Sequence, residues 1–271
     1  MIGWVSRHIF GLFMGLLWII ALAFLLAFWT VSSDSGTRWL LESAAPRIVD
    51  GLKVNGVTGN LISKLQIEDV HFENCQNEIG LTRLVFSWQP GALTQLVVDV
   101  NEISADTFAI NPVAMCDQNV EQEAEAFTVP EKINIPLDIR LGLLRINRIL
   151  VGESESAQII SNVELFAVVK TGTLEVDLKN LDFETLNLSS HLNVKLESPY
   201  ELMGNANWGY QIPGDQYFSG TLALQGNINH YSLNHKLLEP FEIQSRAALM
   251  DPLGTLKFDT EHSWSKIKQI L

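Results

Sequence analysis

The residues from Ile9 to Val31 form a run of 23 without a single charged side chain. As an α-helix with about 1.5 Å per residue, this run is roughly 34 Å long, enough to cross a hydrocarbon core of about 30 Å. Inside lipid, only a helix or a closed barrel satisfies its own backbone hydrogen bonds. We therefore predict that residues 9–31 are a transmembrane helix that holds the following 240 residues at a membrane.

The charges that flank this run predict its orientation. Arg7 and His8 precede it, and Asp34 is the first charge after it. The positive-inside rule then makes residues 1–8 a cytoplasmic tail and places everything after the helix across the membrane. A cleaved signal peptide is the competing interpretation, but its apolar core usually has only about 7–15 residues. We expect an uncleaved signal anchor.

Composition limits the partners of the remaining chain. The formal net charge is −13 and the sequence pI is about 4.8, so we expect no nucleic-acid partner and no electrostatic attraction to anionic lipid. Contact with lipid would use apolar surface. Cys75 and Cys116 lie 41 positions apart and match no zinc or redox spacing. In an oxidising compartment they could form a disulfide, and two unpaired core cysteines are the alternative.

The hydrophobic pattern after the anchor predicts a short helix and then strands. A helix is expected near residues 36–45, with Asp34 or Ser35 as its cap. From Leu52 onward, apolar residues recur mostly at every second position, which is typical of strands with one buried face. The alternation changes phase at Asp69. Residues 32–111 are therefore interpreted as the start of a β-sheet in the compartment beyond the membrane.

Residues 112–136 interrupt the alternation. They contain five acidic side chains, one lysine and three prolines, a composition typical of a solvated loop. The closely spaced carboxylates at Glu121, Glu123 and Glu125 lack the glycine turn and the distal bidentate glutamate of a calcium-binding loop. We expect no metal site in this acidic loop.

Alternating runs resume over residues 137–271 at short spacing, which predicts a β-meander that continues the same sheet. The overall expectation is a mainly β protein with an elongated, antiparallel-type sheet. If this sheet curls, its apolar face would line a groove. Its apolar face is covered either by protein, as in an ordinary sandwich, or by lipid. The candidate lining residues are Leu174, Val176, Leu178, Leu192, Val194, Leu196, Leu222 and Leu224.

No motif predicts catalysis. The sequence has no nucleophile elbow, no P-loop, no zinc-protease motif and no dinucleotide-binding glycine pattern. We therefore expect no catalytic, cofactor-binding or metal-binding residue. The alternation ends near Leu271 without a capping segment, although natural sheets usually protect their edges. We expect the chain to be the front part of a longer protein, truncated at the C-terminus.

Several blocks in this order resemble the N-terminal region of the TamB family, the inner-membrane subunits of the translocation and assembly module. The blocks are SGTRWLLE at residues 35–42, GLKVNGVTGNL at 51–61, LQIEDVHF at 65–72 and LVFSWQP at 84–90. The order and spacing of the blocks agree with that family. The later meander is similar in style.

The resemblance implies an AsmA-like, single-pass protein of the Gram-negative inner membrane, with most of the chain in the periplasm as an elongated, curled β-sheet that forms a groove. It implies a bridge that moves phospholipid towards the outer membrane. The alternative is a subunit that helps insert outer-membrane and autotransporter proteins, together with a TamA-type barrel partner that binds through the missing C-terminal part.

Overall fold

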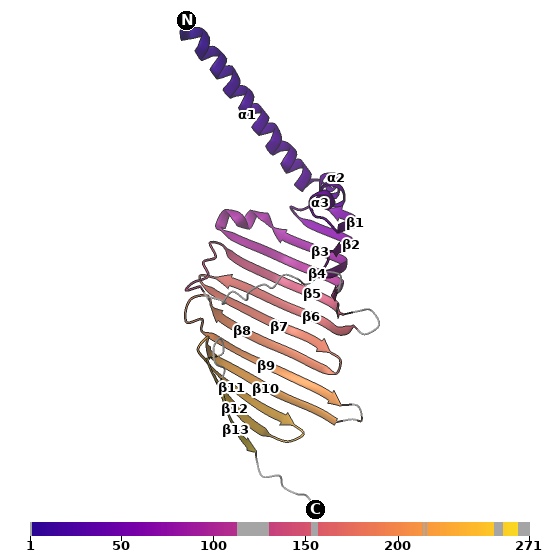
Figure 1. Cartoon of the computed structure of the whole chain (residues 1–271), viewed down its shortest axis with the longest axis vertical. Coiled ribbons are helices and arrows are strands. Elements are labelled where there is room, and N and C mark those ends of the chain that lie inside the picture. Colours follow the sequence, from indigo (N-terminus) through magenta and orange to yellow (C-terminus); the bar gives the residue numbers. More distant parts are fainter. Residues whose placement is uncertain are drawn as a thin grey trace, which may run out of the picture.

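The computed structural model describes residues 2–112, 130–152, 157–212, 214, 216–251 and 257–264. One long helix, α1 (Ile2–Ser32), projects from one end of a single β-sheet (Figure 1). Within α1, the segment Met14–Ser32 is long and apolar enough to cross a membrane, and no part of it is buried by protein. The predicted mainly β fold with an apolar N-terminal helix is confirmed.

Three short helical segments join α1 to the sheet: α2 (Asp34–Arg38), the π-helical turn η1 (Trp39–Ala44) and α3 (Ala45–Ile48). The side chain of Ser33 caps α2 by accepting a hydrogen bond from the backbone N–H of Gly36 at 3.1 Å. The buried Thr37 hydroxyl donates to the carbonyl of Thr30 at 3.1 Å. A Cβ at Gly36 would lie 2.5 Å from the Thr30 Cα, so this close turn requires glycine.

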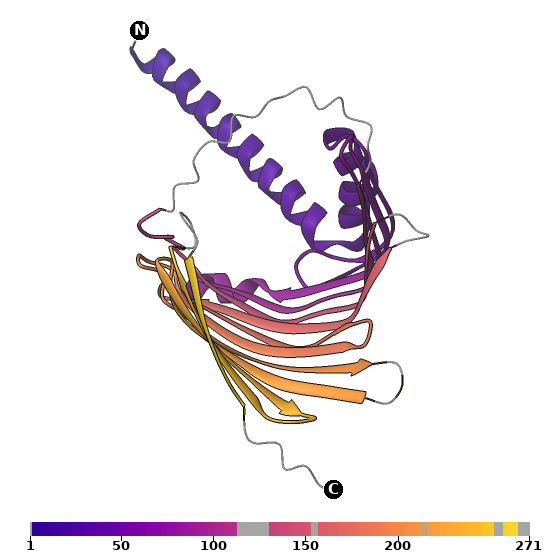
Figure 2. The same cartoon turned by 60° about the horizontal axis from the view of Figure 1, so that its bottom comes forward.

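The sheet has 13 strands, and their spatial order is their order in the chain. At about 4.8 Å per strand it extends roughly 58 Å from the first strand to the last. Figure 2 shows that it curls, so that one face is concave. The strands are β1 (Leu52–Gly59), β2 (Lys64–Glu73), β3 (Asn77–Gln89), β4 (Val97–Pro112), β5 (Asp138–Val151), β6 (Gln158–Lys170), β7 (Thr173–Phe183), β8 (Leu186–Lys195), β9 (Leu202–Ile212), β10 (Gln216–Asn227), β11 (His230–Glu239), β12 (Ile243–Met250) and β13 (Lys257–Trp264).

All neighbouring strands pair antiparallel except β4 and β5, which are parallel, with Val97 opposite Asp138 and Ile110 opposite Val151. Parallel neighbours need a long connection, because the chain must return to the same end of the sheet. The predicted acidic loop supplies this connection, and its residues 113–129 lie outside the described residues. Its last part lies beside the β8–β9 connection, where the Ile133 N–H donates to the carbonyl of Leu196 at 2.8 Å.

The enclosed core is small and lies under the short helices at the β1 end. Val54, Val57, Leu65 and Ile67 are buried there, with Leu41 from η1 packed against them. The whole chain exposes 19355 Å² of surface. A compact protein of 30.3 kDa would expose only about 11,800 Å². In the described part of the chain each strand contacts chiefly its two neighbours, so most of the sheet is a single layer.

The free edge of β1 is covered by two side chains from the helices. Arg38 and Glu42 lie one turn apart and both reach Val57, which is 1 % exposed. The Arg38 Nε–H donates to the Val57 carbonyl at 3.0 Å, and the Val57 N–H donates to Glu42 Oε1 at 2.9 Å. These bonds take the place of a neighbouring strand and protect the edge from pairing with another chain.

Candidate functional site

The groove arises because several strands bend at the same level. In β1 Val54 and Val57 belong to one core cluster although they are three residues apart, and so do Ile67 and Val70 in β2. Strict alternation would place such pairs on opposite faces. The phase shift at Asp69 that the sequence shows is therefore a bend in the sheet.

The same bend continues across the next strands, and we call this line of residues the crease: Gly56, Arg83, Asp106, Asn147, Asn162 and Asn180. Gly56, Arg83 and Asn162 have left-handed backbones, with φ of 70°, 51° and 53°. The register carries the bend from β3 to β4, because Leu81 faces Phe108 and Phe86 faces Ile103. In each strand these apolar residues are five positions apart, an odd spacing that strict alternation would place on opposite faces. Left-handed residues re-aim the side chains that follow, as β-bulges do.

Polar side chains along the crease bond to one another on the convex side. Asp106 is paired with Arg83, and the Asn147 amide donates to Asp106 Oδ1 at 3.0 Å. Further along, the amides of Asn162 and Asn187 donate to Asp182 at 2.7 and 2.6 Å. These bonds link β3 to β5 and β6 to β8, and they hold the curvature of the sheet within each group.

The two carboxylates of this row are stabilised in their ionised form. The hydrogen bond from Arg83, and next that from Asn147, lowers the pKa of Asp106 below its usual value. Hydrogen bonds from Asn162 and Asn187 lower the pKa of Asp182 in the same way. Both carboxylates accept hydrogen bonds at neutral pH, so the crease is a structural feature. Neither aspartate is poised to take up a proton there.

The concave face of the later strands carries most of the predicted lining residues. Leu174 pairs with Val194, and Val176 with Leu192, in direct cross-strand positions between β7 and β8. The row continues through Gly204 of β9 to Leu224 of β10. Seven of the eight predicted residues are half-buried and share this face by register, namely Leu174, Val176, Leu178, Leu192, Val194, Leu222 and Leu224.

The eighth predicted residue, Leu196, lies in a different environment. It follows the end of β8 and is 7 % exposed in the β8–β9 connection. Its N–H donates to the carbonyl of Gly172 at 2.7 Å, and its own carbonyl accepts from Ile133. The structure places Leu196 under the returning end of the acidic loop and away from the open row.

Trp208 and His235 lie on the same face but were not among the predicted lining residues. Trp208 pairs across the strands with Leu188 and Gly220, and its indole lies 5.6 Å from the His235 ring in a stacked arrangement. The indole N–H donates to Nε2 of His235 at 3.2 Å. A Cβ at Gly220 would lie 2.7 Å from the indole Nε1. Trp208 falls on an alternating position of the sequence, but the space that Gly220 leaves for its indole is visible only in the folded structure.

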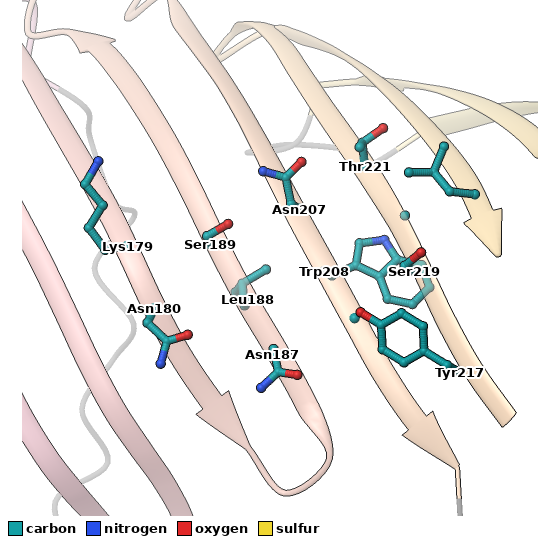
Figure 3. A pocket seen from close by; sticks show the side chains of 13 residues that line it. Lys179, Asn180, Asn187, Leu188, Ser189, Asn207, Trp208, Tyr217, Ser219 and Thr221 are labelled. Carbon is teal, nitrogen blue, oxygen red and sulfur yellow. The ribbon is translucent and has the colours of Figure 1, made fainter. Parts of the chain in front are cut away.

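A shallow hollow lies on the opposite, convex face over β7–β10 (Figure 3). Its lining combines amide and hydroxyl side chains, among them Asn180, Asn207 and Tyr217, with parts of Leu188 and Trp208 that reach it between the strands. Within the described residues, no three His, Cys, Asp or Glu side chains come together to hold a metal ion. The hollow brings together no nucleophile with an adjacent base. The strongest chemical contrast in the molecule is the one between its two faces.

The predicted disulfide involves one residue that the structure places and one outside the described residues. Cys75 lies in the connection between β2 and β3, two residues before Asn77. Asn77 faces Pro112, the last residue of β4, and Cys116 comes four positions later in the sequence. The register thus places the start of β3, near Cys75, opposite the end of β4, and Cys116 lies outside the described residues. The pairing of Cys75 with Cys116 stays a prediction.

The fold and the two faces define a class of protein: a single-layer, open β-groove joined to an apolar helix of membrane-spanning length. Residues 22–152 match the TamB N-terminal domain. This match supports a TamB-family N-terminal portion, as the sequence blocks predict. The comparison with curated proteins found no match, and neither did the comparison with solved structures. Family and helix together are consistent with a single-pass protein of the inner membrane.

Proposed function

We propose that this protein holds phospholipid acyl chains in its groove and lets them move from the inner membrane towards the outer membrane. One observation carries the proposal: over most of the single-layer sheet, none of the described residues covers the apolar concave face. A sheet with one apolar face ordinarily buries that face against a second layer. Acyl chains can supply that second layer.

The energetics of this arrangement are favourable. Moving a methylene from water to an apolar surface stabilises by about 0.8 kcal/mol. A chain that leaves the bilayer for the groove exchanges one apolar environment for another, so its transfer costs little. Because the row from Val176 through Leu192 to Leu224 has no charged side chain, sliding along it meets no polar barrier. No catalytic step is needed.

The proposed orientation has residues 1–8 in the cytoplasm and the sheet in the periplasm. Arg7 and His8 support it, since they are the only ionisable side chains before the apolar run. A periplasmic sheet would lie in an oxidising compartment, which supports the Cys75–Cys116 disulfide. Protein extracted without reductant should then resist maleimide labelling until it is reduced. Full labelling before reduction would contradict both the pairing and the compartment.

Photo-crosslinking in cells tests the proposal directly. The full chain would carry p-benzoylphenylalanine at one of two concave positions, Val176 or Leu222, or at one of two convex positions, Asn193 or Ala223. We expect phospholipid adducts from the concave positions only. Adducts with outer-membrane proteins from the concave positions would instead favour a role in protein assembly with a TamA-type barrel. Equal lipid adducts from both faces would refute the proposal.

A further inference from the structure

The connection between β3 and β4 carries an exposed apolar tip. The 3-10 helix η2 (Pro90–Gln95) forms this connection, and it is followed by Leu96. Leu93 is 40 % exposed and Leu96 is 63 % exposed. The 15 residues from Leu84 to Val98 contain no charged side chain, although the chain as a whole has a net charge of −13. The tip is therefore unusually apolar for a surface connection.

The backbone holds Leu96 in a strained conformation. Its φ is 60° and its ψ is 35°, in the left-handed region. This conformation costs an ordinary residue free energy, and glycine or asparagine is the usual occupant. The backbone hydrogen bonds that fix it run from the Leu96 N–H to the Leu93 carbonyl and from the Asp138 N–H to the Leu96 carbonyl, both at 3.0 Å. Neither bond uses the leucine side chain. The leucine itself is therefore unexplained by folding.

The position of η2 points to its partner. Lys64, the first residue of β2, pairs with Ser87, and β3 continues for two more residues, so η2 extends past the β1–β2 pair near the end of α1. In both views α1 leans over the side of the sheet on which η2 lies (Figures 1 and 2). If α1 crosses the bilayer, the tip faces the same membrane surface that α1 leaves. An apolar, uncharged tip suits the interface of a bilayer, where leucine side chains insert among acyl chains.

We infer that Leu93 and Leu96 insert into the outer surface of the bilayer that α1 spans, as a second membrane contact beside the end of α1. The membrane contact then has two points, α1 and η2, which are separated by the β1–β2 connection, where Leu61 bonds to Val31 of α1 and to Trp88 of β3. Two points fix the tilt of the sheet relative to the bilayer, which a single helix leaves free. The inference rests on α1 as a membrane span and does not depend on lipid movement in the groove.

Crosslinking in vesicles tests this contact. The full chain would be reconstituted in phosphatidylcholine vesicles that contain an alkyne-tagged phosphatidylcholine, with p-benzoylphenylalanine at Leu93 or at Leu96. Met203 on the convex face of β9 is the matched control, because it is 56 % exposed but lies far along the sheet from α1. We expect at least tenfold more lipid adduct from the tip than from Met203. Equal yields, or adducts with protein alone, would overturn the inference.

A substitution separates membrane contact from folding. Asparagine tolerates the left-handed backbone, so Leu96→Asn should leave thermal stability unchanged or raise it. The same change should lower the lipid adduct from a probe at Leu93 at least threefold. A loss of stability, or an unchanged adduct yield, would show that Leu96 does not serve as a membrane contact. A probe at Leu192 in the groove reports on lipid movement separately, so the two proposals can fail independently.

Discussion

A charge placed on the concave face should block the groove, whereas the same charge on the convex face should not. Leu224 and Ala223 are adjacent in β10, and only Leu224 continues the apolar row through Gly204 and Leu192. Ala223 is exposed on the convex face between two neutral asparagines, Asn205 and Asn234. Leu224→Asp and Ala223→Asp therefore add one charge to the same strand, in the same register, on opposite faces.

The magnitude follows from the burial of Leu224. An aspartate in the middle of a membrane costs about 3 kcal/mol. Leu224 is only half-buried, so part of the carboxylate stays hydrated and the cost falls to about 1.5 kcal/mol. This corresponds to roughly tenfold weaker binding of an acyl chain. Because this cost comes from desolvation of the carboxylate and not from an interaction between two charges, we also expect it to depend little on salt.

The assay is the equilibrium binding of a pyrene-labelled phospholipid to the full chain in detergent, followed by fluorescence. We expect Leu224→Asp to raise the dissociation constant about tenfold and Ala223→Asp to change it by less than twofold. Circular dichroism controls for folding, since aspartate is unfavourable in both strand positions. The reasoning is refuted if both variants bind alike, or if Ala223→Asp binds more weakly than Leu224→Asp.

Three further predictions concern the parts that shape the groove. Because hydrogen bonds hold the pKa values of Asp106 and Asp182 below the ordinary 3.8, their contribution to stability is complete above about pH 4 and is lost as pH falls through the lowered values. The thermal midpoint should fall in that acidic range, and less so when both are changed to Asn; an identical pH profile would contradict this. Glu42→Ala should leave the buried N–H of Val57 at the edge of β1 unpaired and cost about 1–3 kcal/mol of unfolding free energy. Glu42→Gln keeps an acceptor and serves as the control. Equal losses of stability in the two variants would speak against the edge bond. Gly36→Ala should destabilise the turn between α1 and α2 by about 1–3 kcal/mol in thermal unfolding. Gly15→Ala, with open space around it, should cause no loss of stability. An unchanged stability of Gly36→Ala would mean that this turn is not closely packed.

The sequence predicted the architecture well because its signals were local. A charge-free run of membrane length and period-two alternation each report on one element at a time. The shift at Asp69 was visible for the same reason. That the bend crosses six further strands was not visible, since it depends on which residues become neighbours. Arg83 and Asp106 are 23 positions apart and meet only through the register of β3 with β4.

The parallel pairing of β4 with β5 shows a second limit. The acidic loop was recognised from its composition, and its length is what a parallel neighbour requires. Composition alone could not distinguish that return path from a tether between antiparallel strands. The burial of Leu196 could not be predicted for the same reason, because the end of this loop lies beside it only in the folded chain. Alternation identifies an apolar face but does not report which segments later lie over it.

The most direct measurement is an experimental density map of the full chain in phospholipid nanodiscs. We expect elongated density along the concave face, over the row from Val176 through Leu192 to Leu224, that fits acyl chains and continues from the bilayer. A concave face filled by a second polypeptide layer, or one that holds only water, would contradict it.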